Sequence, residues 1–414
     1  MCTPAWVIGS KVAQPPTHVA IGNPKVSEVV IYTPRPGAEA GSDDREGGSP
    51  MTIDVAEREA LQEAVRDLLR SRCTEQDVRQ VLTGDDGFDR DLWRRLAEQG
   101  VTGIVIGSEY GGVGLGAVEL EAVAEETGAA LLPSPFISSA VLTAALVQAA
   151  GSEDDKQRLL PGLADGTAIG TVAVTGRAGT WTAEGVDVRA GTDGTLTGSA
   201  HYVTDGQVAD VLLVVANGTD GVGVYEVDPG ASGFERVAAT VFDPSVRLST
   251  FTFTGTPARR LGAAGWDAVQ QALDLATIAL AGEQCGGTRR IFEITVEYLK
   301  TRIQFGRPIG SFQALKHMAA DLLLKVESST SAAQNAAAQR DADPDTAGGA
   351  IALAGFACAE AYRDTAAAAI QMHGGIGFTW EHPAHLYLRR ARTGLQLFGG
   401  PRLHRERYLQ SKGA

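Results

Sequence analysis

The chain has 414 residues, of which 44% are hydrophobic, so it can bury a large core and divide into two or three domains. Its formal net charge of −14 argues against nucleic acid or an anionic membrane as a general partner. No apolar run approaches the roughly 20 residues that a membrane span requires. The four cysteines are scattered without the CxxC spacing of a zinc site: Cys2, Cys73, Cys285 and Cys358. We therefore expect a cytoplasmic protein with reduced thiols and no metal site.

Residues 1–50 differ from the rest of the chain in amino-acid composition and in periodicity. They are rich in Pro, Gly, Ser and Val and show little periodicity. This composition favours disorder. A helical pattern starts directly after Met51, so we hypothesise that Met51 is the natural start and that the preceding residues are an extension from a wrongly assigned start codon.

The remaining chain divides into helices, then strands, then helices. Residues 51–166 carry apolar residues at helical spacing, interrupted by the turn-rich loop SEYGGVGLG at residues 108–116. Residues 167–260 carry β-branched runs bounded by Gly, Asp and Asn about every eight to twelve positions, which predicts a small antiparallel sheet or barrel. Residues 261–414 are helical again, with a break at DADPD, residues 341–345. This segregated order predicts an α+β fold of three domains and not an alternating βαβ fold.

A basic and aromatic stretch, YLKTRIQFGRPIGSFQ at residues 298–313, ends a long proline-free amphipathic run. Its glycine and proline residues interrupt helical structure, which predicts a turn and then a new helix. A fixed guanidinium at Arg302 would suit a phosphate or a carboxylate, because it can donate two parallel hydrogen bonds. Alternatively, Arg302 only offsets the C-terminal dipole of the helix. The chain has no P-loop and no GxGxxG after a predicted strand, which disfavours a Rossmann-type site.

Four longer segments follow one another along the chain: SEYGGVGLG at 108–116, LTGSAHYVTDGQVADVLLVVA at 196–216, TRIQFGRPIGSFQALKHMAADL at 301–322 and QMHGGIGFTWEHPAHLYLRRAR at 371–392. In this order they resemble the signatures of the acyl-CoA dehydrogenase family. The resemblance extends from Met51 to about Leu409. It implies an N-terminal helical domain at 51–166, a middle antiparallel β domain at 167–260 and a C-terminal four-helix bundle at 261–414. It also implies that FAD lies in a cleft between the β domain and the bundle.

The resemblance implies a reaction as well. In that family a Glu removes the α-hydrogen of an acyl-CoA thioester as a proton, and the β-hydrogen leaves as a hydride to the flavin. A thioester carbonyl held near the flavin makes the α-carbon acidic, and an apolar cleft raises the pKa of the carboxylate towards the value that the reaction needs. The electrons then pass to an electron-transfer flavoprotein or a similar acceptor. The expected cofactor is therefore FAD, and the expected substrate is an acyl-CoA.

The resemblance further implies a set of cofactor-binding residues. Tyr202 and Thr204 match the aromatic residue and the threonine that contact the flavin ring, and Thr175 matches the threonine that opens the family's T-E-P-x-A-G-S-D loop. A second set matches residues that act on the FAD of the neighbouring subunit: Arg302, Phe305, Gln313, Gln371, Gly374 and Gly375. Within this set, Arg302 and Phe305 match the residues that hold the pyrophosphate and the adenosine.

The chain departs from the family at both positions that can supply the catalytic Glu. Gly399 stands at the usual position, and Ala276 stands at the alternative position on the long helix. The T-E-P-x-A-G-S-D loop is one residue short, and Trp181 replaces its Asp. These losses resemble the base-less small subunit of the α2β2 acyl-CoA dehydrogenases that actinobacteria use on steroid side chains.

The leading hypothesis is therefore a subunit without a catalytic residue in a heterotetramer, where a paralogous acyl-CoA dehydrogenase subunit supplies the Glu. One alternative is a self-sufficient enzyme with a displaced base at Glu283, Asp274 or Glu109, although carboxylates on helix faces usually pair locally or are solvated. Another alternative is a structural subunit that binds no FAD. The assignment to steroid degradation rests on analogy with the family, because the residues themselves do not identify the acyl group.

Overall fold

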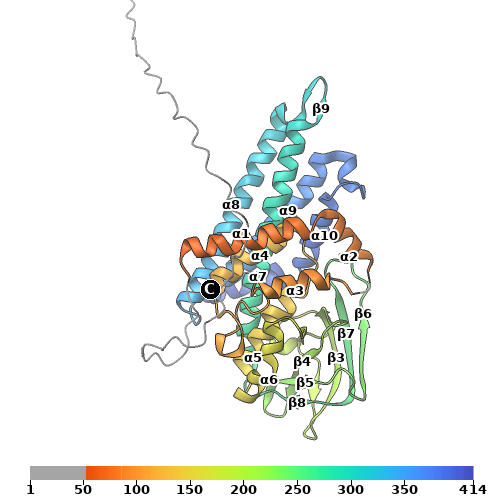
Figure 1. Cartoon of the computed structure of the whole chain (residues 1–414), viewed down its shortest axis with the longest axis vertical. Coiled ribbons are helices and arrows are strands. Elements are labelled where there is room, and N and C mark those ends of the chain that lie inside the picture. Colours follow the sequence, from red (N-terminus) through yellow and green to blue (C-terminus); the bar gives the residue numbers. More distant parts are fainter. Residues whose placement is uncertain (1–52, 85, 414) are drawn as a thin grey trace, which may run out of the picture. The chain divides into compact units, whose positions relative to one another are not determined.

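The computed structural model describes residues 53–84 and 86–413 (Figure 1). The predicted disorder of residues 1–50 and the hypothesis of a start at Met51 lie outside these residues. Within the described ranges, no helix combines the length and the apolar character that crossing a membrane requires.

Six helices form the first part of the described chain: α1 (Val55–Arg72), α2 (Glu75–Thr83), α3 (Arg90–Glu98), α4 (Ala117–Ala129), α5 (Ala144–Ala150) and α6 (Glu153–Ala164). Short polar residues start several of them, because side-chain oxygens satisfy the backbone N–H groups that lack a partner in the first turn. Asp54 and Glu57 form such a reciprocal cap on α1, and Ser152 and Asp155 form one on α6. A π-helical segment, η2 (Phe136–Thr143), leads into α5.

The middle of the chain forms a sheet: β1 (Gly170–Ala173), β2 (Arg189–Ala190), β3 (Thr195–Thr204), β4 (Val211–Gly218), β5 (Gly221–Val227), β6 (Phe234–Ala238), β7 (Leu248–Pro257) and β8 (Arg259–Arg260). The strand order is β6-β7-β3-β2-β4-β5-β8, and β1 pairs with β4. Most neighbouring strands are antiparallel, but β1 and β2 each run parallel to β4. The sheet is therefore mixed and not wholly antiparallel as predicted. Side-chain alternation does not reveal strand direction, and the long segment between β1 and β4 allows the crossover that a parallel pair needs.

The rest of the described chain is mostly helical: α7 (Trp266–Thr301), α8 (Gln313–Ala342), α9 (Gly348–His373), α10 (Ala384–Gly394) and α11 (Gly400–Ser411). α7 packs against α8 and α9, and α9 also packs against α11, so these four helices form a bundle. The predicted α+β fold, with a helical part, a sheet and a helical bundle in this order, is confirmed. The domain boundaries at residues 50, 166 and 260 stay a prediction.

α7 ends where the glycine and proline residues predict a break. The backbone becomes extended at Arg302, with φ −71° and ψ 122°, and β9 (Ile303–Gln304) and β10 (Arg307–Pro308) form a tight hairpin. The two turn residues, Phe305 and Gly306, have φ values of 54° and 74°, as a type I′ turn requires. A short 3-10 helix, η4 (Ile309–Ser311), leads into α8, so the predicted turn and new helix are confirmed.

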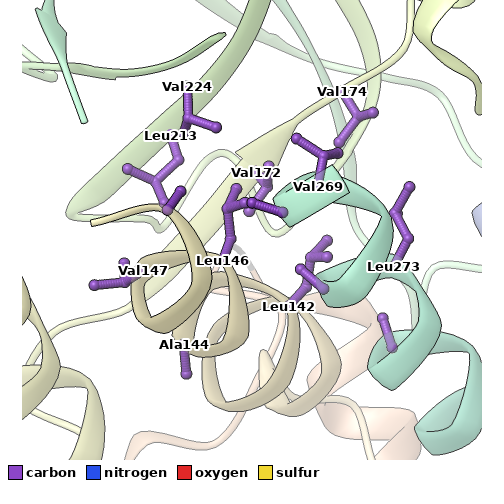
Figure 2. Packing of buried hydrophobic residues seen from close by; sticks show 14 of the residues in the cluster. Leu142, Ala144, Leu146, Val147, Val172, Val174, Leu213, Val224, Val269 and Leu273 are labelled. Atoms are coloured by element: carbon purple, nitrogen blue, oxygen red, sulfur yellow. The ribbon is translucent and has the colours of Figure 1, made fainter. Parts of the chain in front are cut away.

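One apolar core joins α5, the sheet and the start of α7 (Figure 2). Leu146 on α5, Leu213 on β4 and Val269 on α7 are all buried in this cluster. Burial of each such side chain contributes about 1.5–3 kcal/mol relative to exposure. The start of α7 is therefore held against the sheet.

α4 and α7 approach each other closely at glycine residues. A side chain at Gly286 would lie 1.7 Å from the carbonyl oxygen of Glu125, and one at Gly128 would lie 1.9 Å from that of Glu283. Residues without a Cβ allow two backbones to come this close. This contact fixes α4 on the middle of α7.

We expect Leu146→Ala to lower the free energy of unfolding by about 2–5 kcal/mol, because it leaves a cavity in the core that joins α5, the sheet and α7. Denaturant unfolding followed by circular dichroism measures this loss. Leu409→Ala is the control: Leu409 is 53% exposed, so its truncation should change stability by less than about 0.5 kcal/mol. Equal effects of the two substitutions would contradict the described packing.

Candidate functional site

The predicted cofactor residues form two groups, one at the sheet beside the middle of α7 and one at the C-terminal end of α7. The sheet group consists of Thr175, Tyr202 and Thr204, and the tip group consists of Arg302, Phe305, Gln313, Gln371, Gly374 and Gly375. Thr204 of the sheet group lines a small cavity together with Glu283 of α7, and from Glu283 to Thr301 the helix extends for roughly 27 Å at about 1.5 Å per residue. At the tip, the ends of α7 and α9 meet through Tyr298 and His373, whose ring centroids lie 4.6 Å apart. The structure thus brings together the members of each group but separates the two groups.

In the sheet group, Thr175 and Thr204 are buried, whereas Tyr202 is 43% exposed. The Thr175 hydroxyl donates to the carbonyl oxygen of Thr180 at 2.8 Å, and the Tyr202 hydroxyl donates to that of Arg177 at 3.2 Å. These bonds fold the shortened loop after Thr175 onto Tyr202. The polar groups of the loop are therefore engaged with one another.

Two aromatic side chains anchor this loop in the core. Trp181, which replaces the family's Asp, and Phe398 are both buried, and their ring centroids lie 5.3 Å apart with an interplanar angle of 79°. Edge-to-face packing of this kind stabilises a pair beyond the area that it buries. Both rings belong to the apolar core that joins α5, the sheet and α7.

The two positions that could supply a catalytic Glu lie in restrictive surroundings. Gly399 precedes α11 with a φ of 114°, a region that residues with a side chain rarely adopt. A side chain there would also lie 2.5 Å from Cδ2 of Leu403. Ala276 is fully buried in the apolar core. Neither position accepts a carboxylate without rearrangement of its neighbours.

A small cavity remains between the end of β3, α7 and α10. Its volume is about 40 Å³, and Thr204, Glu283 and Phe398 are among the residues that line it. A space of this size holds about one water molecule, whereas ligand pockets measure about 300–1,000 Å³. An acyl chain does not fit in this cavity.

A buried arginine closes one side of the cavity. Arg390 on α10 pairs with Glu283 at 3.0 Å and with Asp243 at 3.5 Å, and it also donates to the carbonyl oxygens of Leu131 and Leu132. Burial lowers the pKa of Arg390, but the two carboxylates raise it by more, so the guanidinium stays charged. Glu283, one of the three alternative bases, is therefore held in an ion pair.

The other two alternative bases are also engaged elsewhere. Asp274 accepts hydrogen bonds from Arg407 at 2.8 Å and from Gln270 at 2.9 Å. Glu109 lies exposed on the short helix η1 (Ser108–Tyr110). Each of the three alternative bases is therefore either paired with a neighbouring side chain or exposed to solvent. In the described part of the chain, no three His, Cys, Asp or Glu side chains are grouped as metal ligands.

Sequence reasoning missed Asp205, which directly follows Thr204. Its carboxylate accepts a hydrogen bond from the Ser138 hydroxyl at 2.5 Å, and burial of the carboxyl group raises its pKa to about 7. Asp205 lines the small cavity together with Thr204. The sequence offered one signal for Asp205: it is an acidic residue directly next to a predicted flavin contact.

The tip group differs from the sheet group because all six of its members are exposed. Arg302 has no ion-pair partner among residues 53–84 and 86–413, and Phe305 is 90% exposed. At Gly374 and Gly375 an added side chain would meet open space, so a ligand can approach the backbone closely. A free guanidinium, an open backbone and an exposed ring fit a phosphate group attached to a flat ring system.

Comparison with known proteins identifies both helical parts. Residues 55–167 match the N-terminal domain of the acyl-CoA dehydrogenase family, and residues 263–407 match its C-terminal domain. The acyl-CoA dehydrogenase IpdE2 of Mycobacterium tuberculosis is 34% identical over 349 residues, which cover 84% of this chain and 94% of that protein. The IpdE2 of Mycolicibacterium smegmatis is 33% identical and covers 84% of this chain and 96% of that protein.

Solved structures agree with this result. A variant of the Tcur3481-Tcur3483 steroid ACAD is 30% identical with a TM-score of 0.78, over 86% of this chain and 98% of that chain. The ChsE4-ChsE5 complex from Mycobacterium tuberculosis is 31% identical with a TM-score of 0.80, over 87% of this chain and 98% of that chain. The predicted resemblance to acyl-CoA dehydrogenases, including one that is named for steroids, is confirmed.

We expect Asp205→Asn to make stability less dependent on pH. The folded-state pKa of Asp205, about 7, exceeds its ordinary value of 3.8. Its contribution to stability is therefore complete below the ordinary value and is lost as the pH rises through 7. Between about pH 5 and pH 8, the wild-type chain should lose roughly 1–3 kcal/mol more stability than the variant.

Denaturant unfolding at the two pH values measures this difference. Asp220→Asn, at an exposed turn position, is the matched control. Parallel pH profiles for the wild-type chain and Asp205→Asn would contradict the raised pKa of this half-buried carboxyl group.

Proposed function

Because the chain belongs to the acyl-CoA dehydrogenase family, an oxidoreductase family, we propose that it is the subunit without a catalytic base in a hetero-oligomeric, FAD-dependent acyl-CoA dehydrogenase. The complex would remove hydrogen from the α and β carbons of an acyl-CoA thioester. The observation that carries the proposal is the contrast between the two groups of cofactor residues. Thr204 of the sheet group faces a cleft that side chains fill except for about 40 Å³, whereas all members of the tip group are exposed.

The filled cleft argues against catalysis in this chain's own site. Trp181 and Phe398 pack together in the core, and the cavity beside them has a volume of about 40 Å³. Opening this cleft would separate buried apolar groups and expose the Arg390 ion pairs, which are costly to break. We therefore place the substrate in a cleft of the partner subunit.

The exposed tip fits a role towards a cofactor held by another chain. FAD, when bound, would accept the hydride that leaves the β-carbon of the acyl group. The residues of this chain would bind and orient it: Arg302 would donate to the pyrophosphate, and Phe305 would contact the adenosine. The open backbone at Gly374 and Gly375 would permit close approach. Roughly 27 Å of helix, from Glu283 beside Thr204 to Thr301, separates this tip from the sheet group of the same chain, which favours a cofactor in a different subunit.

The catalytic base would come from a paralogous acyl-CoA dehydrogenase chain, because Gly399 and Ala276 provide none here. Two similar proteins, the ChsE4-ChsE5 complex and the Tcur3481-Tcur3483 steroid ACAD, are each named for two chains. This naming supports an unlike partner, and the second name supports a steroid-derived acyl-CoA as the substrate class. The electrons would leave to an electron-transfer flavoprotein or a similar acceptor.

We expect Arg302→Ala to weaken FAD binding by the complex about tenfold to a hundredfold, because charge-assisted hydrogen bonds contribute about 1.5–3 kcal/mol. Arg302→Lys should have an intermediate effect, because lysine keeps the charge but lacks the planar pair of donors. Fluorescence titration of the flavin-free complex with FAD measures the affinity.

Arg402→Ala is the control for this experiment, because Arg402 is an exposed arginine on α11, away from the tip group. The chain purified without its partner should hold little FAD and should not oxidise acyl-CoA. Robust dehydrogenation of an acyl-CoA by the pure single-chain protein would contradict the proposal and favour a displaced base.

Phe398→Ala tests the filled cleft separately. The substitution should lower the free energy of unfolding by about 3–5 kcal/mol, because Phe398 is a large buried core residue. FAD affinity of the assembled complex should stay close to the wild-type value, because this cleft takes no part in the partner's flavin site. A loss of FAD affinity as large as that of Arg302→Ala would argue that the cleft of this chain holds the cofactor.

A further inference from the structure

Three aromatic rings meet at the tip of the bundle, beside the tip group. They belong to Tyr298 in the last turn of α7, His373 at the end of α9 and His382 in the loop before α10. The ring centroids of Tyr298 and His373 lie 4.6 Å apart, and those of His373 and His382 lie 4.2 Å apart. Rings at such separations attract each other beyond the area that they bury. These three residues are called the ring cluster below.

Hydrogen bonds orient two of the three rings. Nδ1 of His373 lies 2.7 Å from the carbonyl oxygen of Ala369, so this nitrogen carries the proton and donates it. Nδ1 of His382 accepts a hydrogen bond from the backbone N–H of Ala384 at 3.2 Å. Burial lowers the pKa of both histidines. The lowered pKa favours the neutral form of both rings, which pack at an interplanar angle of 49°.

The ring cluster joins the two chain segments that carry the tip group. The backbone N–H of Arg302 donates to the carbonyl oxygen of Tyr298 at 2.9 Å. On the other segment, His373 follows Gln371 by two positions and directly precedes Gly374, whose φ is 65°. A shift of the His373 ring would therefore move the turn at Gly374 relative to Arg302.

A separate small core lies close to the ring cluster. Leu299 on α7, Leu322 on α8 and Met372 on α9 are buried together there. These contacts hold the three helix ends to one another even when one ring is removed. Loss of a ring should therefore change the geometry of the tip without unfolding the bundle.

We propose that the ring cluster positions the Arg302 guanidinium and the turn at Gly374 relative to each other, and so sets the affinity of the tip for the pyrophosphate of FAD in a partner's cleft. This inference rests on the proposed function and names positioning residues, not direct ligands. A guanidinium makes its full pair of hydrogen bonds only at the correct distance and angle from the phosphate. A displacement of about 1 Å is enough to weaken such a site strongly.

The test uses the complex of this chain with its Glu-bearing partner. His373→Ala and Tyr298→Ala should each weaken FAD binding about three- to tenfold, measured by fluorescence titration of the flavin-free complex. Tyr298→Phe keeps the ring and should retain the affinity. Tyr408→Ala is the matched control, because it removes a ring that packs against Phe356 elsewhere in the bundle, and it should leave the affinity unchanged.

A double substitution separates positioning from a general loss of structure. If the ring cluster acts through Arg302, then His373→Ala should weaken FAD binding less than about twofold in the Arg302→Ala background. The melting temperature of the flavin-free complex should fall no further with His373→Ala than with Tyr408→Ala.

Two results would overturn the proposal while leaving the proposed function intact. The first is wild-type FAD affinity in both ring variants when Arg302→Ala weakens binding. The second is an undiminished effect of His373→Ala in the Arg302→Ala background. If Arg302→Ala itself leaves FAD affinity unchanged, the proposed function fails, and the positioning role fails with it.

Discussion

One continuous helix imposes the constraint on which the rest of this structure depends. α7 starts in the core against the sheet, passes the cavity beside Thr204 at Glu283, and ends at Thr301, roughly 27 Å beyond Glu283. Packing against α4, α8 and α9 holds this helix along its length. The sheet group and the tip group therefore cannot approach each other within one chain. We therefore propose that a single flavin that uses both kinds of contact is bound between two chains.

The two ends of α7 have opposite chemical character. On the sheet side, polar groups bind one another: Thr175 donates to the loop behind it, and Arg390 is paired with Glu283. Buried charges are stable only when paired, so this network resists opening. At the tip, the guanidinium of Arg302 is exposed, and the neighbouring glycine backbone faces open space. A cavity beside Thr204 that is too small for an acyl chain, together with an exposed tip, is what a subunit serving another chain's cofactor would need.

Local signals predicted the order of helices, strands and helices, and also the hairpin after Arg302, because helical periodicity and Gly/Pro turns are properties of neighbouring residues. The direction of β1 relative to β4 was predicted wrongly, because it depends on the path of the chain between them. The contact of Trp181 with Phe398 and the pairing of Arg390 with Glu283 join residues far apart in sequence, so no spacing rule finds them. The absence of a Glu at Gly399 was visible in the sequence, whereas the filling of the cleft required coordinates.

Flavin stoichiometry in the purified complex of this chain with its Glu-bearing partner tests the central claim most directly. Quantification of released FAD against each chain gives the ratio without any assumption about the substrate. We predict one FAD for each pair of unlike chains, because in the proposed complex the partner's cleft would hold the flavin and this chain would contribute only its tip. One FAD for every chain, or FAD retained by this chain alone, would contradict it.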